Sequence, residues 1–467
     1  MRKLVLLFAP ATLAVAVLMA CENDSGVGGP SFSFDASLAD FNAPPPNDGS
    51  TPTPSVDAAP DAPVVPAVSV TVTGAGGPKS GVRIVFHDAA GAVIETKLTG
   101  NDGKATHVGT DAGMASALLA TGSQRHIVTW TGVETGDDLQ VRDGDSNEDV
   151  GLYNVSLSSL FVDSGASIYW VEGPCGGNST YGTAAELPLR RGCTRAQNAV
   201  LATARTFSST VTGHAFKKGN PGVTDGGTAS ITVGDWKEPS TLGLTIANLP
   251  VETSFDSHLL EIADGAGFSN STGDTNGSNV TFKTATGFAD AYQASIRFGD
   301  FGGSEQSITR RFAPAATVEL DYAGLLPSIT DASLDTAAPR RPVISWSTDS
   351  TAGTDGGLVQ FSFSGPEDAN YLWTLVVPPG SKTVTAPAMP AEAESFLPFD
   401  PDSGGESWFG VPEILFVEAD VLPSYAFFRR QQGTLLGLTE SGFGAYSLPA
   451  LPLDGTYKTT SWTAILR

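Results

Sequence analysis

The feature that most constrains the fold of this 467-residue chain is a repeated pattern of short alternating segments separated by turn residues. Val68, Val70 and Val72 alternate with polar Ser and Thr residues, as expected for a half-buried β-strand. Glycine-containing clusters, such as Asn101-Asp102-Gly103 and Asn276-Gly277, lie between these segments. The chain holds 53 glycines but only 4 methionines. The pattern therefore predicts an all-β protein built from several sandwiches in tandem.

The first twenty residues have the features of a secretory signal. Arg2 and Lys3 give a positive start, and residues 4–17 form an apolar run that is too short to span a membrane. The segment Leu18-Met19-Ala20-Cys21 closes the run and resembles the lipobox of bacterial lipoproteins. The resemblance implies that the signal, residues 1–20, is removed and that Cys21 carries a diacylglyceryl group and an acylated amine, typically with palmitate. An ordinary signal peptide with a cysteine near the cut is the alternative.

Residues 21–66 are predicted to be a lipidated, disordered tether. They are rich in proline, glycine and serine, and no Lys or Arg occurs between Lys3 and Lys79. Such a segment cannot bury enough apolar surface to offset the entropy lost on ordering. Together with the lipobox, the tether places the protein at the bacterial cell envelope. We expect a lipid anchor in the outer membrane, with the chain facing the periplasm or the cell surface.

Residues 67–149 form the first predicted domain. The run Pro78-Lys79-Ser80-Gly81-Val82-Arg83-Ile84 is followed by Thr99 and by Asp102-Gly103-Lys104-Ala105. This pattern resembles the carboxypeptidase regulatory-like (prealbumin-like) β-sandwich, and bacterial Ig-like domains share nearly the same signature. The resemblance implies a structural or binding module without catalytic residues. Asn101-Asp102-Gly103 is predicted to be a tight hairpin turn.

The rest of the chain is predicted to contain further β domains. Residues 150–336 read as a central β-rich region of one or two domains. A linker follows over 337–342, and the C-terminal domain, residues 337–467, carries Trp346 and Trp373 on strand-like runs. That arrangement resembles Ig-like and fibronectin-III-like modules. The predicted fold is thus a series of Ig-like or prealbumin-like sandwiches after a disordered tether.

Three cysteines occur in the chain. With Cys21 assigned to the lipid, Cys175 and Cys193 remain, and glycines flank both of them. An exported chain lives in a compartment that permits disulfides. No His or third Cys accompanies the pair, which argues against a metal or redox site. We expect a structural disulfide within the central region.

One acidic loop has oxygen donors at alternate positions, which resembles a calcium-binding loop. The donors are Asp143, Asp145, Asn147 and Asp149. Glu148 stands where an EF-hand requires glycine, so the loop departs from that pattern. A solvated acidic loop between domains is the alternative. Ca²⁺ is the one cofactor that the sequence suggests.

A second acidic loop, in the C-terminal domain, holds Asp400, Asp402 and Glu406 and leads directly into Trp408. An aromatic ring beside carboxylates on a glycine-rich loop is suited to holding a sugar, and the carboxylates are suited to Ca²⁺. A loop anchored by a buried tryptophan is the alternative interpretation.

Charge and motifs narrow the function. A formal net charge of −24 argues against nucleic acid as a partner. The chain has no Gly-x-Ser-x-Gly, His-Glu-x-x-His, Ser-x-x-Lys or P-loop motif. We therefore expect a non-catalytic surface protein that binds a glycan, the matrix or another envelope protein. A structural spacer is the alternative, and a hydrolase with a site built from loops is a weaker one.

Overall fold

A computed structural model describes the folded part of the chain. The described residues are 66–74, 77–122, 124–143, 149–161, 165–174, 176–190, 199–208, 210–218, 230–233, 235–251, 253–272, 277–299, 303–350, 353–367, 369–399, 407–436 and 454–463. The chain divides into two compact units, Met1–Ser31 and Phe32–Arg467, and all described residues belong to the second unit. The signal, Cys21 and the tether up to residue 65 lie outside the described residues. Strands dominate this unit, so the predicted all-β class is confirmed.

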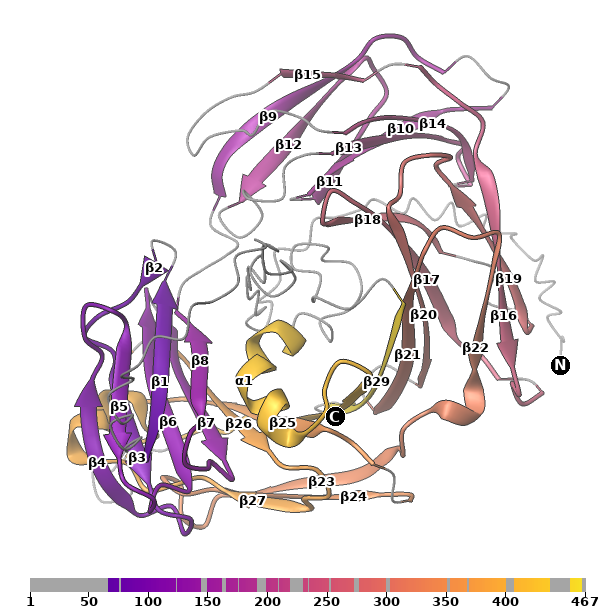
Figure 1. Cartoon of the computed structure of the whole chain (residues 1–467). Helices are drawn as coiled ribbons and strands as arrows, with labels where there is room; N and C mark the ends of the chain where they lie inside the picture. The colour runs from indigo at the N-terminus through magenta and orange to yellow at the C-terminus, as the bar shows by residue number, and fades with distance from the viewer. Residues whose placement is uncertain are drawn as a thin grey trace, which may run out of the picture. The chain divides into compact units, whose positions relative to one another are not determined.

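The largest element is a twelve-stranded sheet (Figure 1). In spatial order its strands are β18 (Ala266–Thr272), β17 (Asp256–Ala263), β20 (Ala291–Gly299), β21 (Ser304–Phe312), β29 (Gly455–Thr463), β28 (Glu413–Ala419), β25 (Gly356–Phe363), β26 (Asn370–Val377), β7 (Gln124–Thr131), β6 (Met114–Thr121), β3 (Arg83–His87) and β4 (Val93–Leu98). Neighbouring strands are antiparallel except β7 and β26, which are parallel. Strands from the beginning and the end of the unit thus share one sheet.

The first sandwich places a small sheet over β3, β4, β6 and β7. That sheet consists of β2 (Gly77–Pro78), β1 (Ala67–Gly74), β5 (Lys104–Val108) and β8 (Asp138–Arg142). Its core includes Val70, Ile84, Phe86 and Trp130. The predicted hairpin at residues 101–103 is wrong: β4 pairs with β3 and β5 pairs with β1, so the turn crosses between facing sheets. Local turn chemistry identifies a tight turn but does not say which strands it joins.

The second sandwich is made of two separate sheets. One holds β12 (Ala184–Arg190), β9 (Asp149–Leu157) and β15 (Ser230–Val233). The other holds β11 (Gly176–Thr180), β10 (Ile168–Gly173), β13 (Val200–Arg205) and β14 (Val211–Lys217). Val155 and Leu187 of the first sheet pack against Val171 and Ala202 of the second. Cys175 and Cys193 both lie outside the described residues, so their disulfide stays a prediction.

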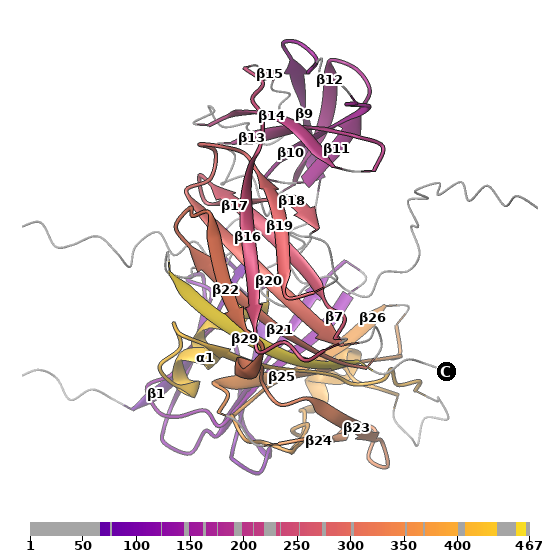
Figure 2. The same ribbon diagram turned by 90° about the vertical axis from the view of Figure 1, so that its right-hand side faces the viewer.

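Two further small sheets cover the twelve-stranded sheet (Figure 2). The first holds β19 (Asn279–Thr284), β16 (Ser240–Ala247) and β22 (Thr317–Asp321), which is followed by the 3₁₀ turn η1 (Tyr322–Gly324). The second holds β23 (Ile329–Asp335), β24 (Val343–Thr348) and β27 (Thr383–Thr385), and the 3₁₀ helix η2 (Ala391–Phe396) follows it. Leu244 and Ile296 share the core of the first pair of layers, and Trp346 and Phe361 share that of the second.

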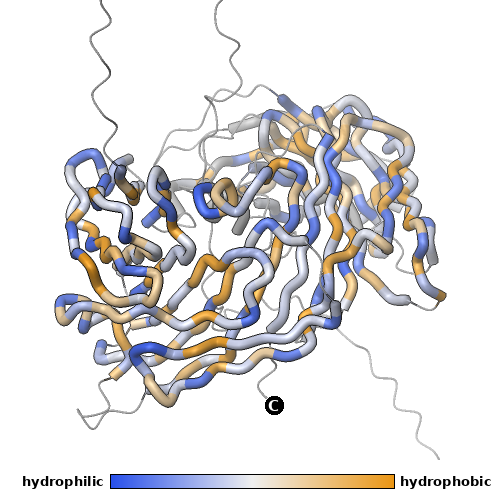
Figure 3. The backbone as a smooth tube through the Cα atoms, turned by 60° about the horizontal axis from the view of Figure 1, so that its bottom comes forward, coloured by the Kyte–Doolittle hydropathy of each residue, from blue (hydrophilic) through white to orange (hydrophobic). Residues whose placement is uncertain are grey.

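Alternation along the strands explains this layering. Apolar and polar residues succeed one another along most strands (Figure 3), as in β16, whose burial alternates from Leu242 to Ile246. Strands of the large sheet that are covered on both faces are apolar almost throughout, as in β26. The predicted boundaries near residues 149 and 336 stay predictions. The ladders cross both of them, because β7 pairs with β26 and β21 pairs with β29.

Candidate functional site

The segment around Trp408 is an exposed aromatic on a rigidly held backbone. The N–H of Ser364 donates to the Trp408 carbonyl at 2.8 Å, and the Trp408 N–H donates to Ser364 Oγ at 2.7 Å. The Gly410 N–H donates to the Ser362 carbonyl at 2.8 Å, and Phe409 forms an isolated bridge with Phe363. Residues 407–410 therefore pair with the end of β25 like a short added strand, which we call the Trp408 strand.

Adjacent side chains in this segment point to opposite environments. Phe409 packs against the core cluster that contains Phe361 and Phe363. Trp408 keeps 57% of its surface exposed. A Cβ at Gly410 would lie 3.3 Å from Cη2 of the indole and would also collide with Ser362 Oγ, so glycine provides the space in which the ring lies. The predicted alternative, a loop anchored by a buried Trp408, is not what the structure has; Phe409 is the anchor.

The acidic residues before Trp408 are not placed. Asp400, Asp402 and Glu406 lie outside the described residues, and their predicted roles toward Ca²⁺ or a sugar stay predictions. The described part of this loop begins again at Ser407, whose hydroxyl accepts from the Phe399 N–H at 2.7 Å. This bond joins Phe399 and Ser407, the described residues that border the acidic segment.

Two other exposed aromatics share one end of the second sandwich. Tyr181, 73% exposed, follows β11, and Phe207, 90% exposed, follows β13. The register of β10 places Thr180 and Arg205 at the same end of that sheet. Because β10 separates the two strands, the turns begin about 9–10 Å apart. This end is a second surface where apolar side chains meet solvent.

Asp143, the first donor of the predicted calcium loop, is buried and already paired. Its carboxylate accepts from Lys79 Nζ at 2.6 Å and from the Thr121 hydroxyl. Asp145 and Asn147 lie outside the described residues, and only the backbone of Asp149, at the start of β9, is described. Among the described residues no group of three or more His, Cys, Asp or Glu side chains is arranged to hold a metal ion.

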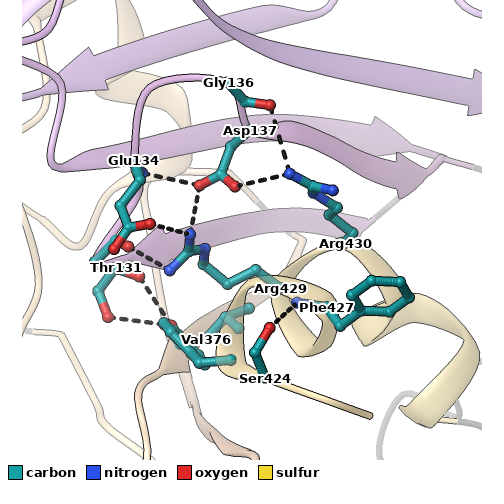
Figure 4. A network of polar contacts seen from close by, with 11 residues as sticks. Thr131, Glu134, Gly136, Asp137, Val376, Ser424, Phe427, Arg429 and Arg430 are labelled. Carbon is teal, nitrogen blue, oxygen red and sulfur yellow. Dashed lines mark hydrogen bonds and ion pairs between the residues drawn. The ribbon is translucent and has the colours of Figure 1, made fainter. Parts of the chain in front are cut away.

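A buried charge network ties the only α-helix of the described residues, α1 (Tyr425–Leu436), to the first sandwich (Figure 4). Arg429 Nη2 lies 2.7 Å from Asp137 Oδ2, and the two side chains are 2% and 3% exposed. The second Arg429 Nη donates to the Gly132 carbonyl. The Tyr425 hydroxyl donates toward the Thr131 and Val376 carbonyls at 2.8 and 3.1 Å, and its burial raises the pKa of that phenol.

This network is suited to holding elements together and not to chemistry. Asp137 Oδ2 also accepts from the Glu134 N–H at 2.8 Å, and Asp137 Oδ1 lies 3.6 Å from Arg430 Nη2, so both oxygens face groups of the fold. Phe428, beside Arg429, is completely buried in the core of the first sandwich. No local pattern in the sequence indicates this pair, because its members are 292 residues apart.

The described histidines lie in separate environments. Burial lowers the pKa of His87 to about 4 and that of His126 to about 3, and lowers that of His214 to about 4. His87 Nε2 lies 3.0 Å from Ser116 Oγ, the spacing of a base and a nucleophile, but both side chains are completely buried. Ser116 Oγ is also hydrogen-bonded to Thr129 Oγ1, which accepts a hydrogen bond from Trp373 Nε1. This polar row therefore links β3, β6, β7 and β26.

Comparisons with known proteins add little. No family model and no curated protein matches the chain. Among solved structures it is similar to the Bacillus anthracis TIE protein, with 12% identity, 55% of this chain and 50% of that chain covered, and a TM-score of 0.16. It is also similar to the chicken CNTN1 FN1–FN3 domains, with 8% identity, coverage of 59% and 86%, and a TM-score of 0.13. The chain thus spans half the length of the first protein, and at these TM-scores neither likeness supports an argument.

Within the described residues, α1 and the 3₁₀ segments are too short or too polar to cross a lipid bilayer.

Proposed function

We propose that this chain is a non-catalytic, lipid-anchored protein of the bacterial cell envelope that binds a ligand at the Trp408 strand. The observation that supports this most is the exposed indole on a backbone held by three hydrogen bonds. An aromatic side chain that stays exposed on a rigid backbone loses little conformational freedom when it binds, so its apolar surface is buried at low entropic cost. Tryptophan is also enriched among the residues that dominate binding energy.

Carbohydrate is the ligand class that we assign to this strand. The flat indole face offers apolar contact to the C–H face of a sugar ring, and hydroxyls of the sugar need hydrogen-bond acceptors nearby. Asp400, Asp402 and Glu406 supply carboxylates in the segment whose two ends meet at the Ser407–Phe399 hydrogen bond. Ca²⁺ held by the same carboxylates would add affinity for sugar hydroxyls, because it prefers oxygen ligands.

The lipid anchor and the tether would set the working distance of the protein. A flexible chain of the length of residues 21–66 spans about 35–40 Å between its ends. The folded unit would then reach ligands beyond the membrane surface. Palmitate labelling tests this part: Cys21→Ala should abolish the label and release the protein from the membrane fraction, and equal labelling of both forms would refute the anchor.

A binding experiment with a matched control tests the ligand site. We expect cell-envelope polysaccharides embedded in a native gel to retard the wild-type protein and to lose that effect with Trp408→Ala. Phe207→Ala removes another exposed aromatic from a turn and should leave retardation unchanged. Retardation that survives Trp408→Ala would remove the Trp408 strand from the site. Loss with Phe207→Ala alone would move the site to the end of the second sandwich.

A structural spacer is the second candidate, and the twelve-stranded sheet favours it. One continuous hydrogen-bonded ladder joins strands from Arg83 to Thr463, which stiffens the unit across three sandwiches. A spacer needs no exposed aromatic. If no envelope polysaccharide or envelope protein binds, and shortening the unit impairs its role in cells, the spacer replaces the binder.

A further inference from the structure

His107 lies between two carboxylates at the edge of the first sandwich. Its Nδ1 is 2.9 Å from Glu95 Oε2, and its Nε2 is 2.9 Å from Asp111 Oδ1. The His107 side chain is only 7% exposed, while Glu95 and Asp111 are 36% and 63% exposed. His107 belongs to β5 and Glu95 to β4, so their contact joins the two facing sheets where no ladder connects them.

The geometry identifies the charge state. An ionised carboxylate accepts hydrogen bonds and cannot donate them, so each ring nitrogen needs its own hydrogen. An imidazole with two N–H groups is the cation, whereas the neutral ring has only one. We propose that His107, Glu95 and Asp111 form a protonation-dependent clasp that closes the β4–β5 edge of the first sandwich. Losing the proton breaks one of the two contacts, because an unprotonated nitrogen then faces a carboxylate oxygen.

The surroundings of the ring support this clasp. Lys97 on β4 contacts the other oxygen of Glu95: its Nζ lies 3.0 Å from Glu95 Oε1 and donates to the Thr106 carbonyl at 2.6 Å. The Phe86 ring of β3 packs 5.4 Å from the imidazole, and Val68 of β1 is its uncharged cross-strand partner. These contacts hold the imidazole in place between its carboxylates.

Gly109 leaves room for the second contact. A Cβ at that position would lie 2.6 Å from Asp111 Oδ1 and 2.8 Å from His107 Nε2. Any larger residue would therefore push the carboxylate and the ring apart. The turn after β5 is thus shaped so that Asp111 reaches the outer nitrogen.

Electrostatics agree with the hydrogen-bond geometry. Burial alone would lower the pKa of His107, but the hydrogen bonds and charges of Glu95 and Asp111 outweigh it and raise the pKa above its ordinary 6.5. The hydrogen bond from His107 is in turn the main cause that lowers the pKa of Glu95 from 4.5 and that of Asp111 from 3.8.

The sign of the pH effect follows from these directions. Because the folded pKa of His107 is raised, its contribution is complete below 6.5 and is lost as the pH rises through the raised value. The two carboxylates contribute above their ordinary values, 4.5 and 3.8, and lose that contribution as the pH falls through their lowered values. The clasp is therefore most complete in mildly acidic solution and loosens in alkaline solution.

Histidine-selective NMR of the full chain in detergent micelles tests the clasp. The His107 resonance, assigned by its loss in His107→Gln, should titrate with a midpoint above 6.5. Glu95→Gln and Asp111→Asn should each lower that midpoint, because each removes one partner charge. A wild-type midpoint at or below 6.5, or a midpoint that neither variant moves, would overturn the proposal.

The pH dependence of amide hydrogen exchange in β4 gives a second test, because a histidine without a protonation-dependent role would not change it. After correction for intrinsic rates, β4 amides should be better protected at pH 6 than at pH 9 in the wild type. This difference should shrink in Asp111→Asn, which keeps only the Glu95 contact, and persist in the control His258→Gln. Equal pH dependence in the wild type and Asp111→Asn would contradict the clasp, and this comparison holds even if His107→Gln fails to fold.

Discussion

The Trp408 strand lies close in the sequence to the Arg429 junction, by which we mean the buried contacts of Arg429 with Asp137 and Gly132. The two regions differ in whether their prominent side chain is exposed or buried. At Trp408 a large apolar group stays 57% exposed on a backbone held by hydrogen bonds. At Arg429 a full charge is 2% exposed and is neutralised by Asp137. The junction pairs its buried charges within the fold, whereas the indole keeps apolar surface exposed to solvent. The first region is therefore the one that we propose to bind a ligand, and the second holds elements of the fold together.

Removing the buried arginine should have the largest effect on stability. Arg429→Ala removes the close partner of buried Asp137 and leaves only Arg430, whose Nη2 is 3.6 Å from Asp137 Oδ1. Breaking a buried pair in this way destabilises by about 3–5 kcal/mol. The matched double variant Arg429→Met with Asp137→Leu removes both charges and should recover most of that loss, because an apolar pair avoids the desolvation penalty. Denaturant unfolding measures both. A loss below about 1 kcal/mol in Arg429→Ala would mean that the junction does not hold the unit together.

A buried tryptophan provides the next comparison. Trp373 is completely buried, and its Nε1 donates to Thr129 Oγ1 at 3.0 Å. Trp373→Ala should destabilise by about 3–5 kcal/mol through the cavity that it opens. Trp373→Phe keeps most of the volume and should destabilise less. Equal thermal shifts for Trp373→Ala and Trp408→Ala would erase the distinction between core and surface tryptophans.

Replacing Lys79 tests whether the Asp143 carboxylate can bind Ca²⁺ once its ion-pair partner is removed. Its partner Asp143 is buried, but Lys79 itself is 37% exposed, so Lys79→Met should destabilise by about 1–2 kcal/mol. If the loop after Asp143 takes Ca²⁺, the variant should bind it more tightly than the wild type, because the ion pair no longer competes. Calorimetry with millimolar Ca²⁺ measures this. No heat with either protein would leave the solvated-loop interpretation.

The sequence predicts strands in this protein far better than it predicts their partners. Alternation placed β1, and the strand-like run around Trp373 is β26, because burial of one or both faces leaves a local pattern. The parallel pairing of β7 with β26 leaves no such pattern, because cross-strand partners such as Ile127 and Trp373 are far apart in the sequence. For the same reason no local signal announced Asp137 as the partner of Arg429.

The candidate site shows the same limit at a single residue. Trp373 stands in a strand-like run, whereas Trp408 follows an acidic, glycine-rich loop and is followed directly by Phe409. Which of the two neighbours faces the core depends on the register that the Phe363–Phe409 bridge sets. A shift by one residue would have buried the indole and exposed the phenyl ring. The sequence could identify Trp408 as a candidate residue. It could not decide whether the side chain contacts a ligand or is buried and anchors the loop.

The stability of Trp408→Ala tests most directly the claim that this residue belongs to a binding surface. An exposed side chain outside the core should contribute little to folding, so we expect the free energy of unfolding to change by no more than about 0.5 kcal/mol. Denaturant unfolding beside Trp373→Ala measures this with the core tryptophan as reference. A change within that limit is the predicted result. A loss of about 3 kcal/mol or more would place Trp408 among the buried anchors and contradict the account.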